Sequence, residues 1–300
     1  MTPMSVTNLW VDCRCVLGEG ILWSARRRAL VWTDIESARV WQAPHPDGEP
    51  RTWAMPDRVG CLAECESGAF LLGFTKKICR SSLAGSQEGD AMLVDVESAL
   101  PQTRLNDGRT DRAGNLVFGT LNEDPGQQKI GSFYQFSARN GLRRLALPAV
   151  VIPNSICFSP DGGTMYFCDS VDRRIMKCAY EADAASVSEV REFVAFGSRR
   201  GFPDGSIVDA DGCVWNAEWR AARVTRYTPE GRIDRVIAVP AKNPTCVAFG
   251  GANLDELYIT SSRQEMTDGE LAATPHAGGV YRALAGVAGM RDTLFKDSTT

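Results

Sequence analysis

Four oxygen-bearing side chains recur along the chain, each before a small residue or an apolar run: Glu19, Asn106, Asn154 and Asp204. Two carboxylates brought together in a confined space are unfavourable unless a cation compensates their charge. Hard divalent cations take such mixed carboxylate and amide oxygens, with water at the remaining positions. The pattern therefore indicates a divalent-metal site. A simple turn is the alternative for any single Asp or Asn before Gly or Ser. Glu19 fits that alternative least, since Glu is a poor turn residue.

These residues belong to a sixfold internal repeat. Taking the residue before each apolar run as the anchor of its unit, the six anchors are Glu19, Gly60, Asn106, Asn154, Asp204 and Thr245. They are separated by 41, 46, 48, 50 and 41 residues. Each unit reads as a short strand, a turn, a stronger strand and two further strand-like runs, rich in β-branched and aromatic residues and punctuated by Asp-Gly and Pro-Glu-Gly turns. Four strands in a unit of about 40–50 residues is the pattern of a propeller blade.

The repeat predicts an all-β fold, a six-bladed β-propeller with four-stranded blades. We expect one domain over residues 1–300, with blades starting near 19, 60, 106, 154, 204 and 245 and a strand at 6–14 completing the last blade. A β-sandwich is the alternative, but it does not explain six units in register. The only candidate for a helix is a short segment at 180–188. Because the first strand of each blade lines the central channel, equivalent anchors should face one another at the axis.

The composition is that of a soluble globular chain, with 44% hydrophobic and 23% charged residues. A net charge of −4 argues against a nucleic-acid or anionic-membrane partner. No apolar run reaches the roughly 18 residues of a membrane span, and no signal peptide is visible, so a cytoplasmic location is expected. The ten cysteines include no C-x-x-C pair. We interpret them as free thiols that mostly serve as small buried hydrophobic residues.

Hydrolysis by a side-chain nucleophile is disfavoured by what the chain lacks. The two histidines are His45 and His276, neither lies at an anchor, and no G-x-S-x-G motif occurs. A Ser-His-Asp triad or a His-ligated zinc site would need one of them in the channel. We expect His45 in a surface loop. His276 falls in an insertion of the last blade at 262–279 that we expect to overhang a channel mouth, where a secondary contact to substrate is conceivable.

Several long motifs, in order over almost the full length, resemble the SMP-30/gluconolactonase/LRE (regucalcin-like) family. They are "LGEGILW" (17–23), "LVWTDI" (30–35), "RLNDGRTDRAGNLVFGT" (104–120), "PNSICFSPDGGTMYFCDS" (153–170) and "PDGSIVDADGCVWNAEW" (203–219). Two departures stand out. Ile21 replaces the family's usual Pro after "GEG", and "RAA" at 220–222 replaces a common pair of glycines, a change expected to reshape the channel rim.

The resemblance implies a six-bladed propeller that hydrolyses a sugar lactone with one divalent cation in its channel. It implies Glu19, Asn154 and Asp204 as metal ligands, and we assign Asp204 the second role of general base toward water. Arg104 and Asn106 match the family's substrate contacts, although a structural ion pair is the alternative for Arg104.

A further acidic substrate contact follows "FGT" in the family. It is Glu123 or Asp124 here, and the residue count favours Asp124. Such a ligand set suits Ca²⁺, Mg²⁺ or Mn²⁺ and could accept Zn²⁺ or Fe²⁺. Two other functions stay open: a metal-dependent phosphotriesterase or arylesterase, and a non-enzymatic calcium-binding propeller.

Overall fold

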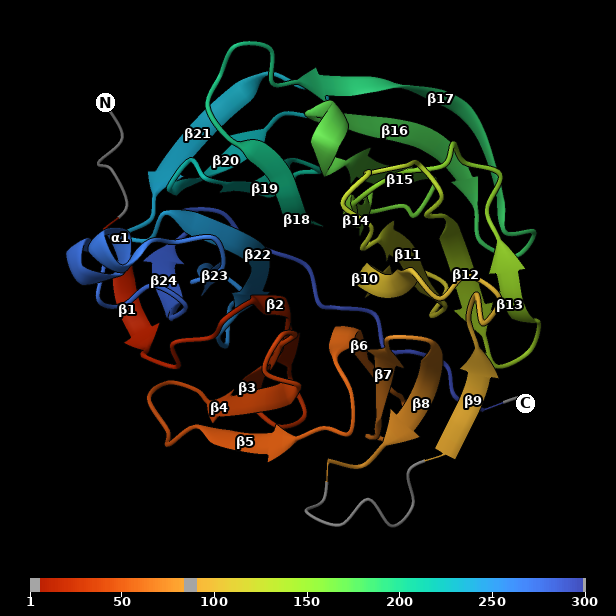
Figure 1. Ribbon diagram of the computed structural model, residues 1–300, viewed down its shortest axis with the longest axis horizontal. Coiled ribbons are helices and arrows are strands. Elements are labelled where there is room, and N and C mark those ends of the chain that lie inside the picture. Colours follow the sequence, from red (N-terminus) through yellow and green to blue (C-terminus); the bar gives the residue numbers. More distant parts are fainter. Residues whose placement is uncertain (1–5, 84–90, 299–300) are drawn as a thin grey trace.

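The computed structural model describes residues 6–83 and 91–298. Its strands form six four-stranded antiparallel sheets arranged in a ring around a central channel (Figure 1). The fold is therefore a six-bladed β-propeller, which confirms the fold predicted from the repeat. Among the described residues, no helix has both the length and the apolar character needed to cross a bilayer.

The first three blades follow the chain in simple order, each with its strands in sequence from the channel outwards. Blade 1 consists of β2 (Gly18–Ser24), β3 (Ala29–Asp34), β4 (Arg39–Pro44) and β5 (Arg51–Ala54). Blade 2 consists of β6 (Val59–Glu64), β7 (Phe70–Phe74), β8 (Lys77–Ser81) and β9 (Ala91–Asp95). Blade 3 consists of β10 (Thr103–Thr110), β11 (Leu116–Asn122), β12 (Phe133–Ser137) and β13 (Gly141–Arg144).

The other three blades repeat this order, and the last recruits a strand from the beginning of the chain. Blade 4 consists of β14 (Pro153–Phe158), β15 (Thr164–Asp169), β16 (Arg174–Glu181) and β17 (Ser186–Ala195), with a 3-10 turn at Ser170–Asp172. Blade 5 consists of β18 (Phe202–Val208), β19 (Val214–Trp219), β20 (Arg223–Tyr227) and β21 (Ile233–Ala238). Blade 6 consists of β22 (Asn243–Gly250), β23 (Glu256–Ser262), β24 (Val280–Leu284) and β1 (Asn8–Val11), with α1 (Asp268–Ala273) between β23 and β24. Pairing of β1 with β24 closes the ring and leaves no open edge at the seam.

Buried Asp side chains shape the tight turns between first and second strands. In "DADG", Asp209 Oδ1 accepts the backbone N–H groups of Asp211 and Cys213, each at 3.0 Å. In "DRAGN" of blade 3, Asp111 Oδ1 accepts the N–H groups of Ala113 and Asn115, each at 2.9 Å. A carboxylate that satisfies two turn amides fixes the hairpin, and with it the position of the inner strand.

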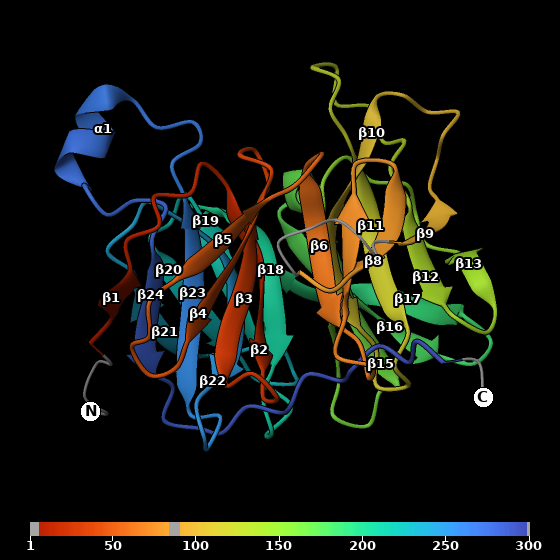
Figure 2. The ribbon, with the colours of Figure 1, turned by 90° about the horizontal axis from the view of Figure 1, so that it is seen from below.

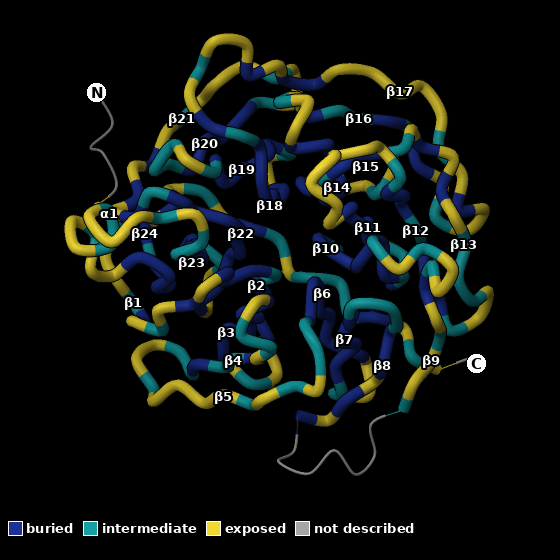
Figure 3. The backbone as a smooth tube through the Cα atoms, in the orientation of Figure 1, coloured by how far each residue is buried: buried dark blue, intermediate teal, exposed yellow. Residues whose placement is uncertain are grey.

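The core consists of apolar clusters between neighbouring blades, not of one central cluster. Each of the six clusters among the described residues joins two adjacent blades. One of them packs Trp215 and Ile207 of blade 5 against Phe249 and Val247 of blade 6. Figure 3 shows the result: the inner strands are buried and the outer strands are largely exposed. The channel is thereby left to polar side chains.

The segment 180–188 does not form a helix, so that expectation is wrong. Residues 180 and 181 end β16, Ala185 adopts a left-handed φ of 50° in the turn, and 186–188 begin β17. Tyr180 and Ala185 both pack into the cluster between blades 3 and 4. The apolar spacing that resembled a helix is therefore the inward-facing part of a hairpin.

A C-terminal strap, residues 285–298, crosses beneath the ring on the face opposite α1 (Figures 1 and 2). It forms β-bridges with blade 5 through Gly289 and with blade 2 through Phe295. At the channel, Asp292 Oδ1 pairs with Arg109 at 3.1 Å and its Oδ2 accepts the N–H of Trp23 at 3.3 Å. Only small cavities, of about 20 and about 10 Å³, remain between the strap and the inner strands.

Candidate active site and metal centre

All six inner strands carry a pairing irregularity at or beside the anchor residue. The register shifts lie between Glu19 and Leu22, Val59 and Cys61, Leu105 and Gly108, Asn154 and Cys157, Pro203 and Ser206, and Pro244 and Val247. An extra residue in one strand bends it and redirects a side chain. In two strands the residue after the anchor is left-handed: Gly20 at φ 58° and Ser155 at φ 60°. These bulges account for the anchors pointing at the axis.

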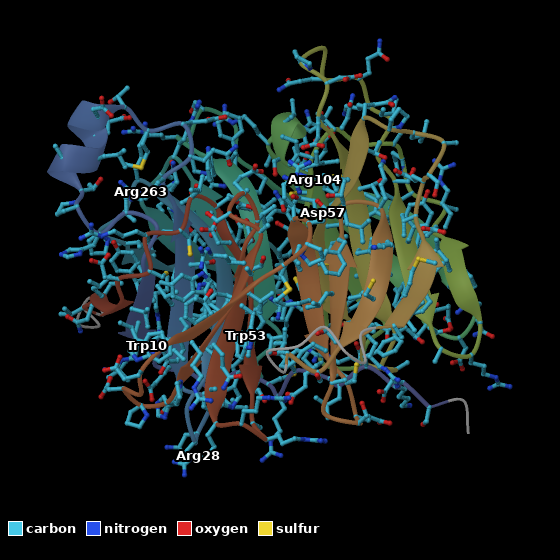
Figure 4. The ribbon with its side chains drawn as sticks, turned by 60° about the horizontal axis from the view of Figure 1, so that its bottom comes forward. Trp10, Arg28, Trp53, Asp57, Arg104 and Arg263 are labelled. Atoms are coloured by element: carbon cyan, nitrogen blue, oxygen red, sulfur yellow. The ribbon has the colours of Figure 1, made fainter. Side chains whose placement is uncertain are left out.

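The inner strands also touch one another in a closed circle, each contacting those of both neighbouring blades. A cavity of about 490 Å³ opens where they meet, and Glu19, Arg104, Asn106, Asn154 and Asp204 all line it. Arg104 lies near the face that carries α1 (Figure 4). The structure therefore brings together five of the residues singled out from the sequence, drawn from four different blades.

Glu19 and Asp204 are buried, with 9% and 6% of their surfaces exposed, and their side chains are hydrogen-bonded to each other. Burial, and then the nearby charge of Asp107, raise the pKa of Glu19 to about 8, although the backbone N–H of Gly20 donates to its carboxylate at 3.1 Å. Burial and the charge of Glu19 raise the pKa of Asp204 well above its ordinary value. Two carboxylates held like this share a proton or a cation.

The arrangement fits a divalent cation. Neither carboxylate forms an ion pair with any residue in the described parts of the chain, and the charge of Arg104 only partly offsets the effects that raise the pKa of Glu19. The described residues contain no group of three or more His, Cys, Asp or Glu side chains suited to a metal. The candidate set instead combines two carboxylates with the amide of Asn154. Hard cations such as Ca²⁺ and Mg²⁺ use oxygen donors of both kinds and keep water in the open positions.

A chain of hydrogen bonds orients the amide of Asn154 across three blades. Arg104 donates to Asn106 Oδ1 at 2.9 Å, and Asn106 Nδ2 donates to Asn154 Oδ1 at 3.1 Å. Asn154 Nδ2 then donates to Ser170 Oγ at 2.9 Å, and Ser170 donates to the carbonyl of Pro203 at 2.7 Å. Because both ends of the Asn154 amide are hydrogen-bonded, the amide is held in one orientation in the cavity wall.

The chain belongs to the SMP-30/gluconolactonase/LRE-like family. The family model matches residues 17–263. Among curated relatives, the chain is 42% identical to L-arabinolactonase of Azospirillum brasilense over 295 residues, covering 98% of this chain and 96% of the relative. It is 34% identical to 6-deoxy-6-sulfogluconolactonase of Pseudomonas putida, covering 93% and 95%. Among solved structures, it resembles a calcium-binding protein, regucalcin, from Agrobacterium tumefaciens, with a TM-score of 0.89, 28% identity and coverage of 97% and 98%.

Arg104 and Asn106, the substrate contacts predicted on β10, lie side by side in the cavity wall. The Arg104 side chain is only 7% exposed, and its Nε lies 3.4 Å from Glu123 Oε1. Glu123 in turn accepts two hydrogen bonds from Arg58, at 2.6 and 2.9 Å. Arg104 thus takes part in an ion pair as well as lining the cavity, so the two roles considered for it do not exclude each other.

Of the two acidic residues after "FGT", Glu123 contacts Arg104. The backbone N–H of Asp124 donates to Asn122 Oδ1 at 2.9 Å, and its carbonyl accepts the N–H of Gln127. Both acidic residues are exposed and neither lines the cavity, so the contact with Arg104 is what distinguishes Glu123. The strand β11 ends at Asn122, so residue counting along the strand stops being a guide at this point.

Both histidines lie outside the cavity. His45 is more buried than a surface loop residue, with 15% of its side chain exposed, and its Nε2 lies 2.9 Å from Glu256 Oε1 in blade 6. The expectation of a simple surface position is therefore wrong for His45. His276 lies 3.3 Å from Asp12 and lines a neighbouring cavity, not the one around Glu19. Cys157, Cys168 and Cys246 are buried in the core, and no disulfide joins cysteines in the described residues.

Sequence reasoning did not single out two buried polar residues of this site. Asp107 is a third buried carboxylate, its Oδ2 accepts the N–H of Ile156 at 2.9 Å, and burial raises its pKa. Ser170 closes the hydrogen-bond chain described above. Both stand inside the quoted motifs, in "RLNDG" and "CDS", so their place in those motifs was the available signal. The remaining wall combines apolar residues, including Phe202 and Trp219, with the polar residues Gln127, Arg220, Gln264 and Glu265.

Proposed function

We propose that this protein hydrolyses a sugar lactone to the corresponding aldonic acid, using one divalent cation held by Glu19, Asn154 and Asp204. The observation that carries the proposal is the buried, hydrogen-bonded pair Glu19–Asp204, which forms no ion pair with a described basic residue, beside the oriented amides of Asn154 and Asn106. Relatives named L-arabinolactonase and 6-deoxy-6-sulfogluconolactonase support the substrate class.

The cavity suits a polyhydroxylated ring. Arg104, which is paired with Glu123, and Asn106 offer charged and amide groups that bind hydroxyls, while Trp219 and Phe202 offer apolar faces for the C–H side of a sugar. A volume of about 490 Å³ accommodates a single lactone ring with its bound water. Anchoring the ring at several points aligns its carbonyl with the carboxylates, and such positioning lowers the barrier by removing orientational freedom.

A bound cation would polarise the lactone carbonyl and lower the pKa of water in the site. Asp204 accepts a proton from the attacking water as the water oxygen bonds to the carbonyl carbon, a contribution typically worth about 10²–10⁴-fold. The ring C–O bond then breaks, and the proton passes from Asp204 to the departing ring oxygen. Glu19 remains ionised and keeps the site negative, while Arg104 and Asn106 hold the ring in place.

The test is a panel of aldonolactones assayed by acid release, with an aryl ester and a phosphotriester beside them. We expect lactone turnover to exceed the other two, to vanish on chelation and to return with one of Ca²⁺, Mg²⁺, Mn²⁺, Zn²⁺ or Fe²⁺. Glu19→Gln should weaken metal binding, measured directly by calorimetry, by at least about tenfold. Glu192→Gln, at a half-exposed site on β17, is the matched control. Full lactonase activity in chelated protein would refute the metal's role, and preferred phosphotriester turnover would refute the substrate class.

A further inference from the structure

A second cavity, of about 540 Å³, lies beside the catalytic one between blades 5 and 6. Its wall is formed by the β19–β20 turn, the loop 239–242 and the residues that follow α1. Figures 1 and 2 show α1 and its flanking loops over this part of the ring. Arg220 lines both cavities, so the two are separated by a single side chain.

Four basic residues line this cavity, Arg200, Arg220, Lys242 and His276, and no Asp or Glu does. The acidic partners stand outside the lining. Arg220 pairs with Glu265 at 2.5 Å, Lys242 pairs with Glu270, and His276 Nδ1 lies 3.3 Å from Asp12. Arg200 is exposed and forms no ion pair with a residue in the described ranges. The lining itself thus brings the positive charges of Arg200, Arg220 and Lys242 to one space, an arrangement that favours an anion.

The rest of the wall is apolar and includes Leu9, Val239, Pro240 and Tyr281. The hydroxyl of Tyr281 is already bonded to the backbone carbonyl of His276, at 2.7 Å, and Tyr281 is only 1% exposed, so it forms the closed back of the wall. A cavity with an apolar wall and a few convergent polar groups is the usual form of a small-molecule site. Its size and chemistry match a ligand with a carbon body and one anionic group.

We propose that this second cavity binds a small organic anion, a carboxylate or a phosphate ester, through Arg200, Lys242 and Arg220. The ligand competes with Glu265 for Arg220. Because Arg220 also stands at the rim of the catalytic cavity, an occupant of the second cavity changes the charge presented to a ligand in the first. This site does not depend on the lactonase proposal, since none of its three basic residues takes part in that chemistry.

The experiment measures binding of gluconate and, separately, inorganic phosphate to the full-length protein by calorimetry at fixed ionic strength. We expect saturable binding in the range of about 1–10 mM, weakened at least about tenfold in the double variant Arg200→Gln/Lys242→Gln. The matched control is Arg174→Gln/Arg191→Gln, which removes two exposed arginines from blade 4. Binding of gluconate alone identifies a carboxylate ligand, and binding of phosphate alone a phosphate ester.

Two results would overturn the proposal. One is the absence of saturable binding of either probe. The other is binding that is unchanged in the double variant but lost in Asn106→Ala, which would place the anion in the catalytic cavity. Thermal unfolding of the double variant checks that α1, anchored by Lys242, stays in place. A variant that unfolds early is replaced by Arg200→Gln alone, for which at least about threefold weakening is expected.

Discussion

Without metal, the protein should lose stability as pH rises through neutrality, because Glu19 and Asp204 must ionise while buried together. The folded-state pKa of Glu19 is about 8, against an ordinary value of 4.5. The folded state therefore holds a proton that the unfolded chain has already released. Stability is unaffected below about pH 4.5, falls as pH rises from there to about 8, and is level above that.

The size of the fall follows from the same interval. Each unit by which the folded-state pKa exceeds the unfolded-state pKa corresponds to about 1.4 kcal/mol. The free energy of unfolding therefore falls by at most about 5 kcal/mol between pH 4.5 and about 8. The hydrogen bond between the two side chains makes the fall a property of the pair. Glu19→Gln keeps the side-chain shape and removes one of the two charges, and it should reduce the fall by at least about half.

The assay is urea denaturation with a chelator present, at intervals from about pH 5 to about pH 9. Near pH 8, metal-free Glu19→Gln should be more stable than metal-free wild type, and saturating divalent cation should reverse that order by stabilising wild type alone. Glu192→Gln, on the outer strand of blade 4, should track wild type throughout. Parallel pH profiles for wild type and Glu19→Gln would show that the buried pair is not the source of the pH dependence, and the reasoning would fail.

Three further predictions concern the walls of the channel. Glu123→Gln should lower lactone kcat/KM by at least about fivefold, since Glu123 contacts Arg104. Asp124→Asn should leave kcat/KM within about twofold of wild type. A larger loss of kcat/KM in Asp124→Asn than in Glu123→Gln would contradict this assignment of the two carboxylates. Gly60→Ala would put a methyl group 2.3 Å from a backbone oxygen of β10, and should lower the free energy of unfolding by about 1–3 kcal/mol in urea; an unchanged urea midpoint would contradict that packing. Asp292→Asn removes the carboxylate that pairs with Arg109 and should lower the free energy of unfolding in urea by about 3–5 kcal/mol. A loss of less than about 1 kcal/mol would mean that the strap contributes little to stability.

The blades could be predicted from the sequence because each begins with the same local chemistry. A short inner strand, a turn built on Asp and Gly and a stronger second strand follow each other within a few residues, so propensity and turn rules apply directly. The spacing of Glu19, Asn106, Asn154 and Asp204 then places them at equivalent positions. That equivalence is sufficient to bring them to one axis, whatever the loops between them do.

The finer geometry of the site depends on contacts that cross the chain. The bulge after Asn154 needs Ser155 in a left-handed conformation, and its hydroxyl is held by the carbonyl of Asp204, 49 residues away. Glu123 and Asp124 differ just past the end of β11, where Glu123 contacts Arg104 and the backbone N–H of Asp124 donates to Asn122 Oδ1. The C-terminal strap could not be predicted, because its sequence lacks the alternating pattern of a strand. It is held instead by isolated bridges and side-chain contacts with several blades.

In the described part of the chain, the strap covers the end of the channel opposite α1, where Asp292 pairs with Arg109. We therefore expect reactants and products to pass through the face that carries α1 and the loop 121–131. A product acid that dissociates slowly then delays binding of the next substrate. Substitutions near α1 or in the loop 121–131 should therefore change product release as well as substrate binding. The described C-terminal residues lie on the opposite side (Figure 2). Immobilising the protein on a solid support through those residues would therefore leave the α1 face exposed to solution.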